Sequence, residues 1–309
     1  MQSGFKKGFL AGLFFIASSS TFAATLDLGI AGDFNVFAFN NFTSHGSDVE
    51  GAVAAGNNVT ASSYSVNANN KSYNGYSLVV GNNLSYNNAS ISNGNVFAGG
   101  TVSTSSFGFS GSVDSGLSPV SFGSVKSGMT SLSNALSDLT ANGNTAIQYG
   151  GITFTGTGTS DVQIFNVSGA DLASVNYANF ASLSAGQSII VNVSGVTAGF
   201  QGGTPQGFAS YNTLFNFYEA STLSFNNVGI FGSILAPNAT VLGGGGQING
   251  NVIVNNWDSS IQVNSNHYFA DVNVPGLVIA VPEPHTYAMM LSGLGLLAFA
   301  SYRRRASQV

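Results

Sequence analysis

The sequence predicts a mainly β protein, a β-solenoid with one long amphipathic helix alongside, and three observations support this fold class. Four separate segments repeat the same short strand pattern, each beginning at a glycine. The glycines are spaced at about the length of one solenoid coil, in which each turn of chain packs on the turn below. A single segment near the middle of the chain has helical periodicity instead.

The strand segments read glycine, a small or polar residue, a β-branched residue, an apolar or small residue and then alanine or valine, at 51–55, 94–98, 232–236 and 250–254. Glycine, proline and asparagine, which favour turns, mark further corners at 56–58, 81–83 and 237–238. Gly232 and Gly250 are 18 residues apart, as are Gly81 and Gly99, and Gly56 precedes Gly81 by 25. A β-sandwich remains the alternative, because short strands at about 8–12-residue spacing look similar.

Residues 121–140 predict the helix, because apolar residues recur there every three or four positions, at Phe122, Val125, Met129, Leu132, Leu136 and Leu139. Its polar face lacks a row of lysine or arginine, so we expect it to pack along the solenoid rather than on a membrane surface. Strand patterns resume at 151–154, 162–167 and 188–193. The helix therefore lies between two halves of one β domain.

The composition excludes several kinds of partner and stabilising group. Charged residues make up 6% of the chain, far below the roughly 25% usual in globular domains, and cysteine is absent. Packing and backbone hydrogen bonds must therefore stabilise the fold without disulfides or zinc thiolates. Residues 25–280 contain only Lys71 and Lys126 as basic residues against eleven acidic ones, a net charge of −9. Nucleic acid is not an expected partner, because phosphate binding needs clustered basic residues.

The N-terminus predicts a secretion signal in residues 1–23. Lys6 and Lys7 precede a short apolar run at 8–17, and small residues follow at the exit of that run. A signal peptidase would cut after Ala23, or after Ala24 as second choice.

The C-terminus, residues 281–309, predicts a sorting tail. Pro282, Glu283 and Pro284 precede an apolar stretch that predicts a transmembrane helix at about 286–302, and Arg303, Arg304 and Arg305 follow, in the order expected for charges that stop translocation and stay in the cytoplasm. This order resembles the PEP-CTERM sorting signal, which implies cleavage by an exosortase-type enzyme in a Gram-negative-type bacterium that also makes extracellular polysaccharide. A permanent membrane anchor is the alternative.

The body at 24–280 also resembles a known family. The stretches that carry the likeness are 32–37 (GDFNVF), 47–57 (SDVEGAVAAGN), 215–220 (FNFYEA) and 232–239 (GSILAPNA), and it spans about residues 26–269. They resemble the choice-of-anchor A family of bacterial surface domains, which implies surface display, adhesion or a place in the biofilm matrix, with no established reaction. Residues 215–253 also resemble, more weakly, the end of ice-binding β-solenoids, which pack a long helix beside their coils.

The residues reveal no constellation that predicts an enzyme. No Gly-x-Ser-x-Gly elbow is present, and we assign no catalytic residue, cofactor or metal. The alternative is a polysaccharide-acting enzyme that uses Asp48, Glu50 and Glu219 as carboxylates. Calcium held by Asp33, Asp48 and Glu50 is a further hypothesis.

Two other groups of residues have both a structural and a functional interpretation. Glycines 243–246 lack the lysine of a phosphate-binding loop and predict a flexible corner between two coils. Four tyrosines could stack on sugar rings or lie half-buried in a sheet: Tyr64, Tyr73, Tyr76 and Tyr86. The preferred function is therefore an exported, non-enzymatic surface or matrix protein that binds polysaccharide, cells or solid surfaces.

Overall fold

The four glycine-led segments lie side by side on one face of the structure, a computed structural model that describes residues 24–202, 206–279 and 292. This face is a continuous parallel sheet of ten strand segments. In spatial order they belong to β13 (Val162–Ser168), β15 (Ser188–Ser194), β17 (Asn212–Asn216), β19 (Ser233–Asn249), β20 (Val252–Ser259), β2 (Val36–Ala38), β4 (Val53–Ala55), β6 (Tyr76–Val80), β8 (Asn95–Ala98) and β10 (Val113–Asp114).

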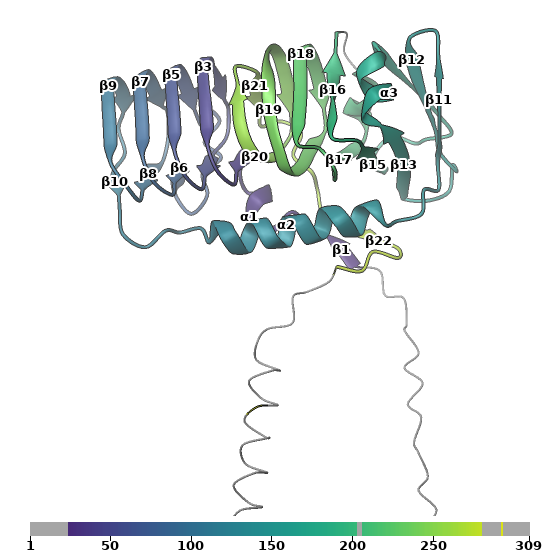
Figure 1. Cartoon of the computed structure of the whole chain (residues 1–309), viewed down its shortest axis with the longest axis horizontal. Helices are drawn as coiled ribbons and strands as arrows, with labels where there is room; N and C mark the ends of the chain where they lie inside the picture. Colours follow the sequence, from purple (N-terminus) through teal and green to yellow (C-terminus); the bar gives the residue numbers. More distant parts are fainter. Residues whose placement is uncertain (1–23, 203–205, 280–291, 293–309) are drawn as a thin grey trace, which may run out of the picture.

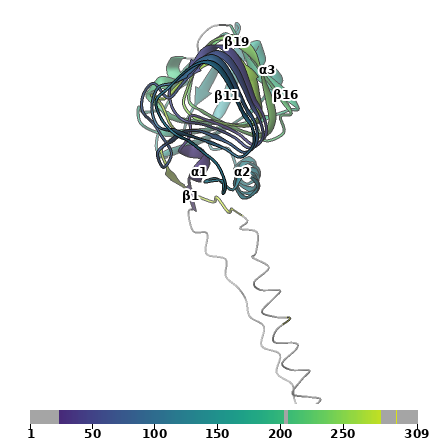
Figure 2. The same ribbon diagram turned by 90° about the vertical axis from the view of Figure 1, so that its left-hand side faces the viewer.

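Two further faces complete each coil. They are formed by long strands that bend in the middle, where residues with positive φ stack from coil to coil at Gly46, Ser63, Asn88 and Ser106. The coil cross-section is therefore roughly triangular (Figure 2). The strands of these two faces are β3 (Phe42–Val49), β5 (Val59–Val66), β7 (Leu84–Ile91), β9 (Val102–Phe109), β16 (Thr197–Gln201), β18 (Thr222–Phe231), β21 (Gln262–Asn264) and the later parts of β19 and β20.

This architecture confirms the β-solenoid and shows that the β-sandwich alternative is wrong, because a sandwich pairs its strands antiparallel. The predicted coil lengths are also present. The Asn82 side chain donates to the Asn57 side-chain oxygen, 25 residues earlier, at 3.1 Å, and the Thr101 N–H donates to the Asn83 side-chain oxygen, 18 residues earlier, at 2.9 Å. One turn of chain thus lies directly on the previous one.

The helix-covered face, as we call the ten-stranded face, is buried on both sides. Residues such as Val53 and Val252 point into the coils, and their neighbours Ala54 and Ile253 point outward against α2 (Phe122–Ser137). Strands buried on both sides are expected to be almost continuously apolar, which explains the composition of the glycine-led segments. The predicted amphipathic helix lies within its expected range of 121–140.

The path of the chain is less regular than its coils. The chain enters at mid-length, and the coils from β2 to β10 build toward one end; α2 then runs back along the helix-covered face, and the coils from β13 to β21 return toward the middle (Figure 1). There β20 pairs with β2, so the last coil stacks on the first. The termini of the domain meet beside α2, where β1 (Ala24–Leu26) pairs antiparallel with β22 (Val272–Val274), close to α1 (Gly29–Gly32).

A separate small sheet lies at the end where the returning coils start (Figure 1). Ile152 and Phe154 on its middle strand are buried in the solenoid core, so this sheet closes that end. The predicted strand at 151–154 thus belongs to this sheet and not to a coil. The elements here are β11 (Asn144–Gln148), β12 (Gly151–Thr155), β14 (Tyr177–Ala181), α3 (Gly169–Ser174) and the short 3-10 helix η1 (Gln206–Ser210).

The predicted processing residues fall almost entirely outside the described residues. These are Ala23, Pro282, Glu283, Pro284, Arg303, Arg304 and Arg305, together with nearly all of the helix predicted at 286–302. Ala24 is the first residue of β1 and pairs with Val274. Among the helices of the described segments, none has the length and apolarity needed to cross a bilayer.

Candidate binding surface

One exposed face of the solenoid presents regular rows of hydroxyl and amide side chains, and we call it the hydroxyl face. Along its strands, residues such as Phe42, Ala61 and Tyr86 point inward and are buried, while the residues between them point outward. The outward residues, each exposed or half-buried, are Thr197, Gln201, Thr222, Ser224, Asn226, Thr240, Leu242, Asn256, Asp258, Thr43, His45, Thr60, Ser62, Ser85, Asn87, Ser103 and Ser105.

The strand register aligns these side chains in rows that run along the solenoid. One row passes from Ser224 through Leu242, Asp258, Thr43 and Thr60 to Ser85 and Ser103. Neighbours in the rows are hydrogen-bonded: the Ser105 hydroxyl donates to the Asn87 side chain at 3.0 Å, and the Asn256 side chain donates to the Thr240 hydroxyl at 3.1 Å. Because the backbone sets the row spacing at about 4.8 Å, the face is a regular array.

A ladder of asparagines fixes the corner where this face begins. The Asn41 side-chain oxygen accepts from the Asn58 N–H at 3.2 Å, and the Asn58 side-chain oxygen accepts from the Asn83 N–H at 3.2 Å. The Asn256 side-chain oxygen continues the ladder by accepting from the Asn41 N–H at 3.2 Å. The predicted Gly-Asn corners are thus stacked one above another, and they hold the strands of the hydroxyl face in register.

The hydroxyl face carries a shallow hollow around its two ionisable residues, His45 and Asp258. Hydroxyl groups surround them, and the hollow is lined by Thr43, Ser44, His45, Thr60, Ser62, Gly243, Asp258, Ser259 and Ser260. His45, which the sequence predicts to cap a turn at 44–46, is exposed on this face just before the Gly46 bend. Every lining residue except Gly243 carries a hydroxyl or an ionisable group, so the hollow offers hydrogen-bond donors and acceptors to a hydroxylated ligand.

The three carboxylates of the enzyme alternative do not lie on the hydroxyl face. Asp48 follows the Gly46 bend, on the remaining side of the coils, which we call the third face. There it accepts from the Gln262 side chain at 3.3 Å. Partial burial raises the pKa of the Asp48 carboxyl, the bond from Gln262 opposes this, and the Glu50 carboxylate adds to it. Glu50 accepts from the Ser265 N–H at 2.9 Å and from the Asn69 side chain at 3.0 Å. Glu219 lies in another coil and accepts from the Gly195 N–H at 2.6 Å.

The hypothetical calcium ligands do not form a cluster. Asp33 lies beside Asp27 and Asp271. Partial burial raises the pKa of the Asp33 carboxyl, and the charges of Asp27 and Asp271 raise it further. Within residues 24–202 and 206–279, no group of three or more His, Asp or Glu side chains is arranged so that it could hold a metal ion. Asp33 is therefore not a partner of Asp48 and Glu50.

Tyr64 and Tyr86 lie in the core and are 2% and 1% exposed, so they are buried more deeply than the half-buried positions that the sequence predicted. Tyr73 and Tyr76 pack against Phe34 and Phe97, at ring-centroid distances of 4.9 and 6.4 Å. The four rings do not form an exposed sugar-stacking platform.

The sequence predicted a flexible loop at glycines 243–246, and this prediction is wrong. The four glycines are part of strand β19. Gly243 and Gly246 have positive φ, and a Cβ atom at either position would collide with the backbone of Phe225 or Val228 in the next coil. Glycine is needed here because two coils approach closely at the bend.

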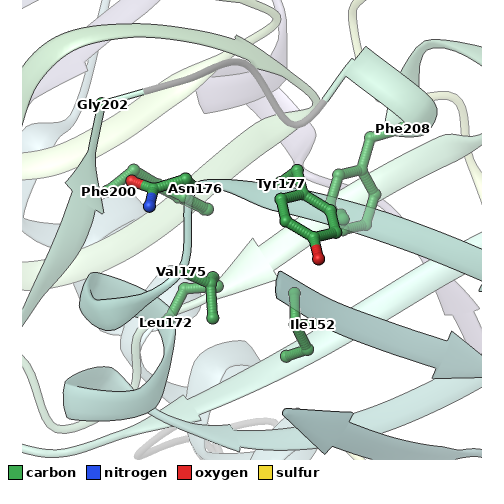
Figure 3. A pocket seen from close by; sticks show the side chains of 9 residues that line it. Ile152, Leu172, Val175, Asn176, Tyr177, Phe200, Gly202 and Phe208 are labelled. Carbon is green, nitrogen blue, oxygen red and sulfur yellow. The ribbon is translucent and has the colours of Figure 1, made fainter. Parts of the chain in front are cut away.

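An enclosed pocket lies near the closed end, between α3, β12 and β14 (Figure 3). Side chains from Leu172, Ile152 and Phe200 make it mainly apolar, with Asn176 and Tyr177 as the polar residues. Its interior has room for no more than about one water molecule, so it does not accommodate a substrate. The candidate binding surface is the hydroxyl face, because of its regular rows.

Matches to two family models support the interpretation of this chain as a surface protein. A family model described as "Putative Ice-binding-like adhesive domain" matches residues 27–265, and a model of the PEP-CTERM protein-sorting motif matches residues 280–305. The second match confirms the resemblance of the C-terminal tail. The chain is also similar to the crystal structure of an ice binding protein from an Antarctic biological consortium, at 14% sequence identity, covering 83% of this chain and 95% of that chain, with a TM-score of 0.34. No curated protein matches the chain in sequence.

Proposed function

Because the chain belongs to the family of ice-binding-like adhesive domains, we propose that it is an exported, non-enzymatic surface protein that adheres to extracellular polysaccharide through its hydroxyl face. The adhesive-type domain and the sorting motif together support export and association with the cell surface. The motif implies processing by exosortase-type machinery.

Further parts of the proposal come from the sequence. Residues 1–23 act as a signal peptide that signal peptidase removes at Ala23 or Ala24, and residues 281–309 form a tail that anchors the chain briefly in the inner membrane. Cleavage occurs at Pro282, Glu283 and Pro284, and the domain at 24–280 is then held at the surface or in the biofilm matrix of a Gram-negative-type bacterium. The likeness to choice-of-anchor A domains supports this arrangement.

The observation that carries the adhesive role is the regularity of the hydroxyl face. A polymer with a short repeat can contact many rows at once, and weak contacts that form together give strong overall binding. Serine, threonine and asparagine lose little side-chain entropy when a ligand orders them, unlike lysine or arginine. The backbone ladders already hold the rows in place, which reduces the cost of ordering further.

The charge of the face indicates which polysaccharide it suits. Asp258 and His45 are the ionisable residues among the outward side chains of the hydroxyl face, so no row of cations is present there to bind an acidic polymer. Hydroxyl and amide groups both donate and accept hydrogen bonds, as sugar hydroxyls do. We therefore assign neutral polysaccharide as the ligand class.

The position of the chain ends supports display of this face. β1 and β22 meet beside α2, on the side of the helix-covered face (Figures 1 and 2). An anchor attached there holds the helix-covered face toward the cell, and the hydroxyl face is a different side of the coils, which α2 does not cover. The contacts of Glu50 and Glu219 with backbone N–H groups favour a structural role for these residues over catalysis.

A pair of variants on one strand tests the proposal. Ser62 points outward on the hydroxyl face, and Ser65, three residues later on β5, points outward on the third face. We expect Ser62→Glu to weaken binding of the full chain to neutral polysaccharide from a biofilm matrix, because a charge interrupts the rows, and Ser65→Glu to leave it unchanged. The measurement is retention on immobilised polysaccharide. Equal retention of parent and both variants would remove the hydroxyl face from the proposal.

A further inference from the structure

The two ends of the solenoid differ, and the end formed by β9 and β10 is open. Within the described residues β9 pairs only with β7, and β10 pairs only with β8. Their outer edges therefore present backbone N–H and C=O groups that no strand of the described chain pairs with, which is the arrangement through which sheets extend from one chain to another.

The open end also exposes the core row of the last coil. In the register, Val102 stacks on Leu84 and Val113 on Val96. Leu84 and Val96 are 1% and 0% exposed, whereas Val102 and Val113 are 41% and 47% exposed. Phe107 and Phe109, whose rings stack at 5.2 Å, are also only partly buried at this end. An apolar surface bounded by unpaired strand edges is suited to another coil.

Nothing in the sequence of this edge prevents such pairing. Natural edge strands are commonly protected by lysine, proline or a bulge, and residues 102–113 contain neither a charged residue nor proline. The nearest charge, Asp114, is engaged within the chain, since its carboxylate accepts from the Tyr76 hydroxyl at 2.9 Å and from the Ser112 hydroxyl at 3.1 Å.

The opposite end is covered by a separate sheet. There the sheet β11–β12–β14 lies across the solenoid, and Phe154 of β12 packs edge-on against Phe165 of the first returning coil at 5.1 Å (Figure 1). Phe154 and Phe165 are fully buried. This sheet covers the coil core at that end, so the uncovered coil that matches an open end is the open end of a second copy.

We propose that the β9–β10 end is a docking surface for a second copy of this chain, which pairs head to head through a two-fold axis. A two-fold axis reverses strand direction, so the edges pair antiparallel and the core rows of both end coils bury each other. An isologous contact of this kind closes after two copies and does not continue into a fibre.

The chain ends select the direction of this axis. When the axis is normal to the helix-covered face, β1 and β22 of both copies leave on the same side, so that one membrane can hold both anchors. In this arrangement β10 lies opposite β10 of the second copy. The half of β9 before the Ser106 bend lies opposite the half after the bend in the second copy. Val113 then lies close to the axis.

Two lysine variants test the docking surface, with the full chain purified in mild detergent. Val102 at the open end and Ile147 on β11 at the closed end are both 41% exposed, which makes them matched positions. We expect the parent to be dimeric in light scattering, Val102→Lys to be monomeric because it places an unpaired charge in the apolar contact, and Ile147→Lys to stay dimeric. Circular dichroism checks that both variants are folded.

A cross-linking measurement keeps the proposal testable if Val102→Lys fails to fold. The chain has no cysteine, so a single introduced cysteine forms a disulfide only between chains. Under mild oxidation Val113→Cys should give a covalent dimer and Ile147→Cys should not. A monomeric parent, an association that Val102→Lys and Ile147→Lys affect equally, or equal cross-linking of the two cysteine variants would overturn the head-to-head interface.

Discussion

Buried asparagines connect parts of the chain that are far apart in sequence. Asn35 donates to the Gly250 carbonyl at 2.7 Å, 215 residues away, and to the Asn264 carbonyl at 3.1 Å, and its side-chain oxygen accepts from the Gly51 N–H at 3.0 Å. Asn251 similarly donates to the carbonyls of Gly32 and Phe34, each at 2.8 Å. These bonds lie where the first coil meets the last. The asparagine content, which from composition indicates turns and a hydrated surface, thus also holds the two halves together.

Three acidic residues near the pairing of β1 with β22, namely Asp27, Asp33 and Asp271, make stability depend on pH. Burial, with the charges of Asp27 and Asp271, raises the pKa of Asp33, and burial with Asp27 raises that of Asp271. Between the unfolded-state and folded-state pKa values of these two carboxyl groups, the folded protein binds more protons than the unfolded chain. The free energy of unfolding therefore falls as pH rises through the folded-state pKa values. We expect Asp33→Asn to raise the thermal midpoint at pH 7 and to lose this advantage below about pH 4.

The comparison needs a control for the loss of one negative charge. Asp258→Asn, at an exposed position on the hydroxyl face, serves this purpose. Thermal unfolding of parent and both variants from pH 3.5 to 7 is the measurement. A midpoint difference between Asp33→Asn and parent that does not change with pH would contradict the carboxylate repulsion.

At the scale of elements, α2 has two roles that depend on its length and its apolar stripe. Its 16 residues span about 24 Å, so with its flanking linkers it returns the chain along the helix-covered face. Met129, Leu132 and Leu136 cover the outward apolar residues of that face. Polar contacts fix its position: the Asn192 side chain donates to the Leu136 carbonyl at 2.7 Å, and the Ser133 hydroxyl donates to the Asn216 side chain at 2.6 Å.

Truncating the stripe of α2 should destabilise the whole solenoid. Leu136 is 0% exposed, so Leu136→Ala is expected to lower the free energy of unfolding by about 2–5 kcal/mol through lost contacts and a cavity. Asn134→Ala, on the exposed side of the same helix turn, should change it by less than about 0.5 kcal/mol. Denaturant unfolding measures both. Similar losses for the two variants would mean that the stripe is not what α2 contributes.

At the scale of the whole molecule, the described chain enters and leaves the solenoid at mid-length, with its two ends paired. β1 and β22 are joined by three antiparallel residue pairs, from Ala24 with Val274 to Leu26 with Val272. The two described chain ends therefore meet beside α2, away from both ends of the solenoid (Figure 1).

Replacing the acidic residue of the sorting motif tests whether the tail is cut. We expect Glu283→Ala to be exported but to stay in the inner membrane with its tail intact, because the apolar stretch and the arginines stop translocation without the motif. His285→Ala, just after Pro284, should be processed normally. Fractionation and intact-mass measurement decide the outcome, and parent protein in the outer fraction that still ends at Val309 would show a permanent anchor instead.

The sequence by itself determined the local units of this protein: the glycine-led strands, the Gly-Asn corners, the amphipathic helix at 121–140, and the ordered signal of Pro282, Glu283, Pro284 and the terminal arginines. These are short-range patterns, because a coil needs apolar residues inside and turn residues at its corners whichever coil lies next to it. The strands of the binding surface, such as β3, β5 and β7, were not among the predicted segments, because their serine-, threonine- and asparagine-rich sequences lack a continuous apolar run. The rows from Thr43 to Ser103 could not be read without the register.

Only the tertiary structure decided the order of the coils, the pairing of β2 with β20, the closed end at β12 and the open end at β9. Parallel coils are joined by the same backbone hydrogen bonds whichever two coils are neighbours, so the periodicity of the sequence does not record which coil packs on which. The contacts that choose among these orders are long-range and specific, such as those of Asn35 with Gly250 and Asn264, and they exist only when the two halves have folded against each other.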